Sequence, residues 1–145
     1  MPTKGRAVAG DELWVAQGAY QPTLTPTRTI SFNLKSGVAI YGGFLGGETL
    51  LSQRNFTANI TTLTGDLNSD DITVGVNENS HHVINGASAN ATAILDGFTV
   101  AAGNASAANP NDRGGAMLML SGSNATFRNC NFINNRCTFG GGAGY

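Results

Sequence analysis

Apolar and polar residues alternate along this chain in short runs, and loops rich in glycine and asparagine separate the runs. The clearest unit covers residues 114–120 and 124–135, and similar units cover 30–44 and 81–100. Within each run the apolar side chains lie two residues apart, which is the period of a β-strand. No window shows the 3.6-residue period of a long helix. The pattern predicts an all-β chain made from a repeated strand–loop–strand unit.

A large apolar residue in each unit is followed, two positions later, by a residue that tolerates a left-handed backbone. Glycine and asparagine adopt that backbone at the lowest cost, so each pair predicts a strand that ends at a corner. The steps between the apolar members are 23, 32 and 32 residues, as expected for coils that carry loops of different length. The four pairs are Ile40 with Gly42, Leu63 with Gly65, Leu95 with Gly97 and Phe127 with Asn129.

A strand, a corner and a second strand, repeated, form a coil, and coils stacked about 4.8 Å apart form parallel sheets in register. The sequence therefore predicts a parallel β-solenoid, with apolar side chains along its axis and Asn or Thr ladders outside. The 145 residues fit a single domain, residues 1–145, of roughly six coils. The side chains expected on the axis are Ile40, Leu95, Val100, Phe127 and Phe132.

Charge is sparse in this chain and nearly balanced. Only 12% of the residues are charged and the net charge is −1, which gives no electrostatic basis for binding nucleic acid or an anionic membrane surface. No apolar run approaches the ~20 residues of a transmembrane helix. No apolar stretch of the signal-peptide type follows the first residues. We therefore expect neither a nucleic-acid partner nor a transmembrane segment.

Several short motifs occur in an order that resembles a known class of protein. They are the segments 11–22, 32–44, 47–49, 79–83 and 95–99, the pair Gly65-Asp66, and the segments 114–116 and 132–135. Together they resemble the opening coils of large bacterial surface proteins with right-handed parallel β-helix repeats. The last two are similar to the GGA(I/L/V) and FxxN repeats of chlamydial polymorphic outer membrane proteins. The resemblance spans almost the whole chain and implies a right-handed, single-stranded, pectin-lyase-like fold in a secreted or surface-displayed protein.

The resemblance leaves two classes of function open, because proteins with this fold include adhesins, uncharacterised surface proteins and polysaccharide-cleaving enzymes. A catalytic groove would need several acids and an Arg or Lys base from successive coils on one face. Few charges in this chain stack in that way. The sequence therefore favours a non-catalytic structural or adhesive module of the cell surface over a fragment of a polysaccharide lyase or glycoside hydrolase. A cell-surface polysaccharide or protein is one expected partner.

The resemblance also predicts that the chain is a fragment of a larger solenoid. In such proteins a capping segment precedes the motif at 11–15, and further coils follow the motif at 132–135. We therefore expect a solenoid cut at both ends, and unpaired terminal strands favour pairing with another chain. A second expected partner is thus another copy of this chain, stacked end to end.

The segment 65–71 carries oxygen-bearing side chains at alternate positions. Ca²⁺ prefers carboxylate and amide oxygens supplied by a tight loop. Counted from Asp66, the loop departs from an EF-hand, because no glycine stands at its sixth position and Asn77 stands at its twelfth. A solvated loop whose Asp and Asn side chains cap turns is the commoner arrangement. The predicted Ca²⁺ ligands are Asp66, Asn68, Asp70 and Asp71.

Other candidate residues have structural interpretations. Arg128 stands 32 residues after Asp96, which predicts a surface contact between these two charges on neighbouring coils. His81 and His82 are adjacent, so on a strand they point to opposite faces and cannot share one metal ion. No catalytic residue is assigned.

The cysteines and the sequons leave alternatives open. Cys130 is expected to face inward beside Phe132, where a free thiol packs as a small apolar group. A disulfide with Cys137 is the alternative in an oxidising compartment. Five segments match the N-glycosylation pattern, and they begin at Asn55, Asn59, Asn90, Asn104 and Asn124.

Overall fold

Short β-strands make up the core of the chain, which we describe from a computed structural model over residues 6–120 and 122–144. One 3-10 helix, η1 (Leu51–Gln53), lies in a loop. The predicted all-β class is confirmed. The strands are β1 (Glu12–Ala16), β2 (Gly18–Tyr20), β3 (Phe32–Asn33), β4 (Ala39–Phe44), β5 (Thr61–Thr64), β6 (Ile84–Asn85), β7 (Ile94–Asp96), β8 (Thr99–Ala101), β9 (Asn104–Ala105), β10 (Met117–Leu118), β11 (Thr126–Arg128), β12 (Asn131–Ile133) and β13 (Arg136–Cys137).

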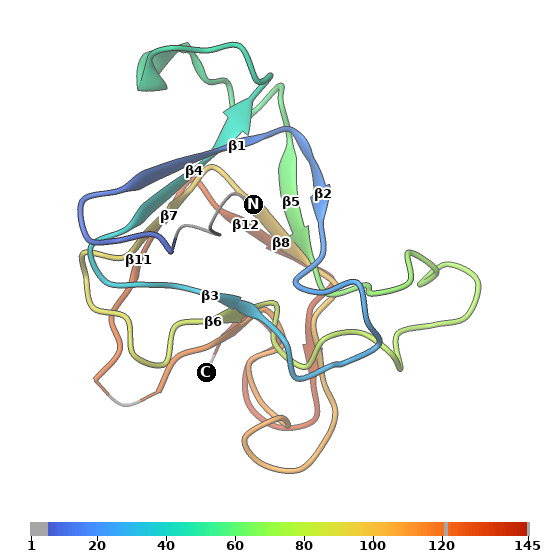
Figure 1. Ribbon diagram of the computed structural model, residues 1–145. Helices are drawn as coiled ribbons and strands as arrows, with labels where there is room; N and C mark the ends of the chain where they lie inside the picture. Colours follow the sequence, from blue (N-terminus) through green and yellow to red (C-terminus); the bar gives the residue numbers. More distant parts are fainter. Residues whose placement is uncertain (1–5, 121, 145) are drawn as a thin grey trace.

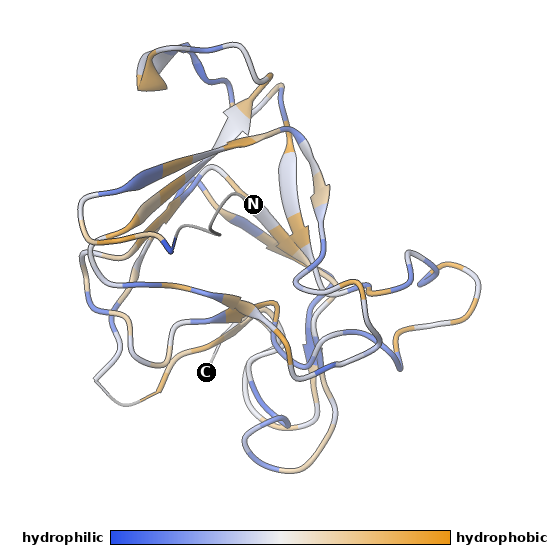
Figure 2. Ribbon diagram, in the orientation of Figure 1, coloured by the Kyte–Doolittle hydropathy of each residue, from blue (hydrophilic) through white to orange (hydrophobic). Residues whose placement is uncertain are grey.

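All strand pairs are parallel. We call one full turn of the chain through the sheets a pass, and the chain visits the sheets in the same order on every pass. The first sheet has the order β1-β4-β7-β11, the second β2-β5-β8-β12 and the third β3-β6-β10, and a short pair joins β9 and β13. Viewed along the stack, the three sheets form the sides of a triangle (Figure 1). Apolar residues recur along the strands of all three sides (Figure 2). The predicted parallel, in-register pairing is confirmed.

Two ladders of apolar side chains supply the core. In the first sheet, Leu13, Ile40, Leu95 and Phe127 are successive register partners. In the second sheet, the partners are Tyr20, Leu63, Val100 and Phe132. Leu95 and Val100 are fully buried, while Ile40, Phe127 and Phe132 are half-buried against the same cluster. The predicted burial is confirmed for Leu95 and Val100, in the middle of the stack, whereas Ile40, Phe127 and Phe132 pack on the same cluster but are only partly buried.

The position of Leu63 corrects the predicted spacing. Leu63 pairs with Val100 in the second sheet, so it is not a neighbour of Ile40 on one ladder. The predicted corner at Gly65 is therefore the second corner of a pass. The spacing of apolar residue and glycine is the same at both corners, and for this reason the sequence pattern did not separate them.

The left-handed residues at the first corner are Gly43, Gly97 and Asn129, with φ of +96°, +83° and +48°. The prediction is confirmed at Gly97 and Asn129. It is wrong at Gly42, where the left-handed residue is the next one along, and at Gly65, which is not left-handed. Gly42 is required for space instead, because a Cβ there would lie 2.5 Å from the carbonyl oxygen of Gly97.

Among the described residues, the number of passes is smaller than the sequence predicted. Glu12 pairs with Ala39, Ala39 with Ile94 and Ile94 with Thr126, so successive passes use 27, 55 and 32 residues. Within the described residues the first sheet therefore has four strands, against roughly six coils of twenty-odd residues expected from a repeat of this kind. The longest pass carries two insertions, the loop with η1 and the loop between β5 and β6.

Candidate metal centre

The loop between β5 and β6 leaves the stack after Gly65 and returns at Ser80. The amide of Ser80 donates a hydrogen bond of 2.8 Å to the carbonyl of Gly65, which closes the base of the loop. Asp66 organises its first turn, because its carboxylate accepts hydrogen bonds from the amides of Asp70 (3.1 Å) and Asp71 (3.5 Å). The residues between these anchors fold back so that both arms of the loop meet.

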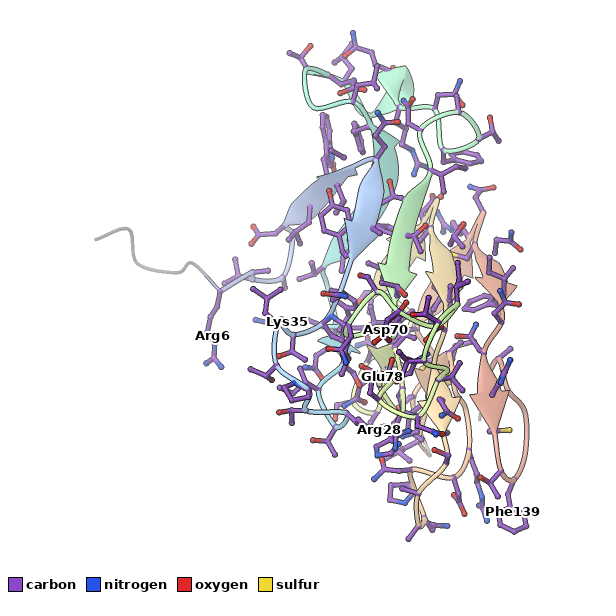
Figure 3. All side chains as sticks on the ribbon, turned by 90° about the vertical axis from the view of Figure 1, so that its right-hand side faces the viewer. Arg6, Arg28, Lys35, Asp70, Glu78 and Phe139 are labelled. Atoms are coloured by element: carbon purple, nitrogen blue, oxygen red, sulfur yellow. The ribbon has the colours of Figure 1, made fainter. Side chains whose placement is uncertain are left out.

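Four carboxylates gather where the arms meet. One oxygen from each of Asp66, Asp70, Asp71 and Glu78 lies within 4.8 Å of the others. Asp70 and Glu78 come from opposite arms of the loop and lie together on one side of the stack, near Arg28 (Figure 3). We call these four residues the acidic cluster.

Three oxygens of the acidic cluster are shielded from solvent without a hydrogen-bond partner among the described residues: Asp70 Oδ1, Asp71 Oδ1 and Glu78 Oε1. Burial raises the pKa of Asp71, and the charges of Asp66 and Asp70 raise it further against the hydrogen bond from Asn79. Burial also raises the pKa of Glu78. Shielded carboxylate oxygens that lack donors are costly, and a hard divalent cation would satisfy them.

Asn79 connects the acidic cluster to the next pass. Its side chain is completely buried, and Nδ2 donates to Asp71 Oδ2 (3.1 Å) and to the carbonyl of Ala102 (2.7 Å). Its Oδ1 has no hydrogen-bond partner among the described residues. The carbonyl of Asn79 accepts a hydrogen bond of 2.7 Å from Arg28 Nε. The conformation of the acidic loop is therefore coupled to contacts between passes.

Three of the four predicted calcium ligands, Asp66, Asp70 and Asp71, are brought together. Asn68 is exposed on the same loop, and its role as a ligand stays a prediction. The sequence analysis missed Glu78. Asn77 occupies the twelfth position of the loop, where a calcium loop carries an acidic ligand, and Glu78 is the next residue. The presence of an acid beside the expected position could have identified it.

Asp96 forms its ion pair with Arg54, and the predicted contact with Arg128 needs correction. Arg128 and Asp96 are register partners, but the Nη2 of Arg54 lies 3.0 Å from Asp96 Oδ1. Arg54 also donates to the carbonyl of Asp96 (3.1 Å) and lies over the rings of Tyr41 and Phe56. The arginine comes from the η1 loop, outside the repeated strands, so the coil spacing did not reveal it.

Both histidines are buried and bind backbone carbonyls of the next pass. His81 Nδ1 lies 3.3 Å from the carbonyl of Asn104, and His82 Nδ1 lies 2.9 Å from that of Gly114. Burial lowers the pKa of His81, and the charge of Arg28 lowers it further. Each histidine thus has its own set of contacts, and these contacts hold neighbouring passes together.

The two cysteines are free thiols. Cys130 packs against the core as predicted, and burial raises the pKa of its thiol. Among the sequons, Asn104 is buried and its Nδ2 donates to the carbonyl of Val76 at 2.6 Å. That side chain is occupied within the fold and is not available for a glycan.

Comparisons with protein-family models, with curated proteins and with solved structures find no match for this chain. No helix in the described ranges has the length and apolar character needed to cross a bilayer.

Proposed function

We propose that this chain is a right-handed β-solenoid that serves as a non-catalytic structural and adhesive module at the cell surface or outside the cell. One observation supports this most strongly: polar side chains of types that often act in catalysis form hydrogen bonds between successive passes. Each of them donates a hydrogen bond to a backbone carbonyl of a neighbouring pass. They are Arg28, Arg54, Asn79, His82 and Asn135.

Calcium has a structural role in this proposal. The acidic cluster would hold the ion, with Asp70, Asp71 and Glu78 offering the shielded oxygens that no donor satisfies. The ion would supply positive charge that neutralises the carboxylates, while the chain's own Asn79 keeps the loop attached to Ala102. Because the ligands come from both arms of one loop, a bound ion would stabilise the folded state and not the unfolded chain.

A neutral glycan is the partner that the outer surface fits best. A groove of about 400 Å³ lies at the corner between the first and second sheets, beside the segment that joins η1 to β5. Its lining includes Phe56, Thr57, Thr99, Asn129 and Asn131 and no charged side chain. An aromatic ring beside amides and hydroxyls supplies both the apolar contact and the hydrogen bonds that a sugar needs.

The calcium role is tested by thermal unfolding in EDTA and in millimolar Ca²⁺. An ion at a hundredfold excess over its Kd adds roughly 3 kcal/mol, which for a domain of this size raises Tm by about 6–12 °C. Glu78→Gln should remove the rise. Glu12→Gln, the same chemical change at an exposed acid of the first strand, should keep it. An equal rise in both variants would exclude the acidic cluster as the site.

The non-catalytic role is tested with polygalacturonate and with a neutral polysaccharide as substrates, in the presence of Ca²⁺. We expect no cleavage. Release of unsaturated products from either substrate by the unmodified chain would contradict the proposal and would support the lyase alternative.

A further inference from the structure

The uncharged groove at the corner between the first and second sheets contains a hydrogen-bond acceptor whose orientation is fixed by the fold. Asn129 lines the groove, and its Nδ2 donates to Asp96 Oδ1 at 2.8 Å. An ionised carboxylate only accepts hydrogen bonds, so the side-chain amide cannot exchange its two ends. Arg54 holds that carboxylate in turn, with Nη2 3.0 Å from the same oxygen. The Oδ1 of Asn129 is therefore the free end, and it accepts no hydrogen bond from the described residues.

Two further polar side chains line the groove. Thr99 and Asn131 are register partners on β8 and β12, about 4.8 Å apart. Their neighbours Val100 and Phe132 pack in the core, so the alternation along each strand turns Thr99 and Asn131 outward. Neither of these two side chains forms a hydrogen bond with the described part of the chain. The groove thus offers a fixed acceptor at Asn129 and two adaptable donors beside it.

Apolar surface lies next to these polar groups. The side chains of Phe56, Ile60 and Phe98 line the same groove, and Ile60 is 49% exposed. A ligand hydroxyl that donates to Asn129 would bring its own lone pairs into this partly apolar groove, which is costly when they find no donor. An amide N–H carries no lone pair and avoids that cost. A methyl group on the same ligand would cover the apolar surface of Ile60.

We infer that the groove selects glycans that carry N-acetylated amino sugars. The inference rests on the neutral-glycan role proposed above and names the sugar. The N–H of the acetamido group donates to Asn129 Oδ1, and its carbonyl accepts from Asn131 or Thr99. Its methyl group packs on Ile60. The group is uncharged, as the lining of the groove requires, and the volume of about 400 Å³ lies within the roughly 300–1,000 Å³ of small-ligand sites.

The test compares two trisaccharides that differ only in this group. One is triacetylchitotriose, the trimer of N-acetylglucosamine, and the other is cellotriose, the glucose trimer with the same linkage and a hydroxyl in place of each acetamido group. Binding of each to the unmodified chain is measured by isothermal titration calorimetry. One hydrogen bond and one covered methyl group each change Kd by a factor of roughly three to ten. We therefore expect the Kd of the acetylated trimer to be about tenfold or more below that of cellotriose.

Two variants locate the selectivity in the groove. Asn129→Gly removes the acceptor and tolerates the left-handed backbone at φ +48°. It should raise the Kd of the acetylated trimer about fivefold and that of cellotriose less than about twofold. Its matched control is Asn134→Gly, the same change at a left-handed asparagine (φ +54°) outside the groove lining. Ile60→Thr removes part of the apolar surface and should also weaken only the acetylated trimer, and its control is Ile72→Thr at a fully exposed isoleucine.

The outcomes separate the sugar from the broader glycan role. Equal Kd values for the two trimers overturn the acetamido selectivity and leave the neutral-glycan role standing. A preference for the acetylated trimer that is unchanged in both Asn129→Gly and Ile60→Thr, with each variant folded by circular dichroism, overturns the placement of the acetamido group in this groove. Binding of neither trimer overturns the inference, and retention of the chain on a neutral polysaccharide then decides the glycan role separately. The calcium role is judged by its own assay.

Discussion

The clearest test of the stacked core compares the same substitution at two positions of one ladder. Leu13 and Leu95 belong to the same ladder of the first sheet, two steps apart through Ile40. Leu95 is completely buried and Leu13 is 40% exposed. Replacing Leu95 by alanine removes buried methyl groups in the middle of the stack, which costs about 3–5 kcal/mol. At Leu13 only part of that area is buried, and we expect about 1–2 kcal/mol.

The measurement is urea unfolding followed by circular dichroism, at a protein concentration low enough to keep the chain monomeric. Circular dichroism is preferred to fluorescence because Trp14 lies next to Leu13 and would report local changes. We expect the midpoint of Leu95→Ala to fall well below that of Leu13→Ala with similar slopes. Equal losses at the two positions would refute the stacked ladder, because the order of burial along it would then have no energetic effect.

Three further outcomes follow from contacts around the corners and the acidic loop. Arg54→Ala should cost about 3–5 kcal/mol in chemical denaturation, because it leaves the buried carboxylate of Asp96 unpaired, and the double variant with Asp96→Ala should lose less than the single one. Asn129→Ala should cost about 1–3 kcal/mol, since φ is +48° and the side chain donates to Asp96, whereas Asn129→Gly should lose only the hydrogen bond. In EDTA, burial raises the pKa of Asp71 in the folded state. The contribution of Asp71 to stability is therefore complete below its unfolded-state pKa of about 3.9 and is lost as the pH rises through its folded-state pKa. Asp71→Asn should therefore raise Tm at neutral pH in EDTA and have little effect near pH 4, and a pH-independent difference would contradict the raised pKa.

The period of the apolar residues was enough to predict the strands and the residues on the axis. Leu95 and Val100 follow the two-residue alternation on either side of Gly97, and both are fully buried. This part succeeds because alternation, burial and the left-handed corner are all local properties of a few consecutive residues. Leu63 was assigned to the wrong ladder because the two corners of a pass have the same local pattern.

The contacts made by inserted loops were not predictable from the repeat. Arg54 reaches Asp96 across 42 residues, and Glu78 joins Asp66 only because the loop folds back on itself. A repeat aligns strand residues one coil apart, and it carries no information on residues that lie between the strands. Asp66, Asp70 and Asp71 were found because they are close in sequence, which is also why the ligand from the other arm was missed.

Calorimetric titration of the apo chain with Ca²⁺ decides whether calcium holds the acidic loop of the proposed structural module. We expect binding of one ion per chain, absent in Glu78→Gln and retained in Glu12→Gln. No heat of binding at millimolar Ca²⁺, together with an unchanged fold in EDTA, would contradict the claim and leave the acidic cluster as an unliganded turn.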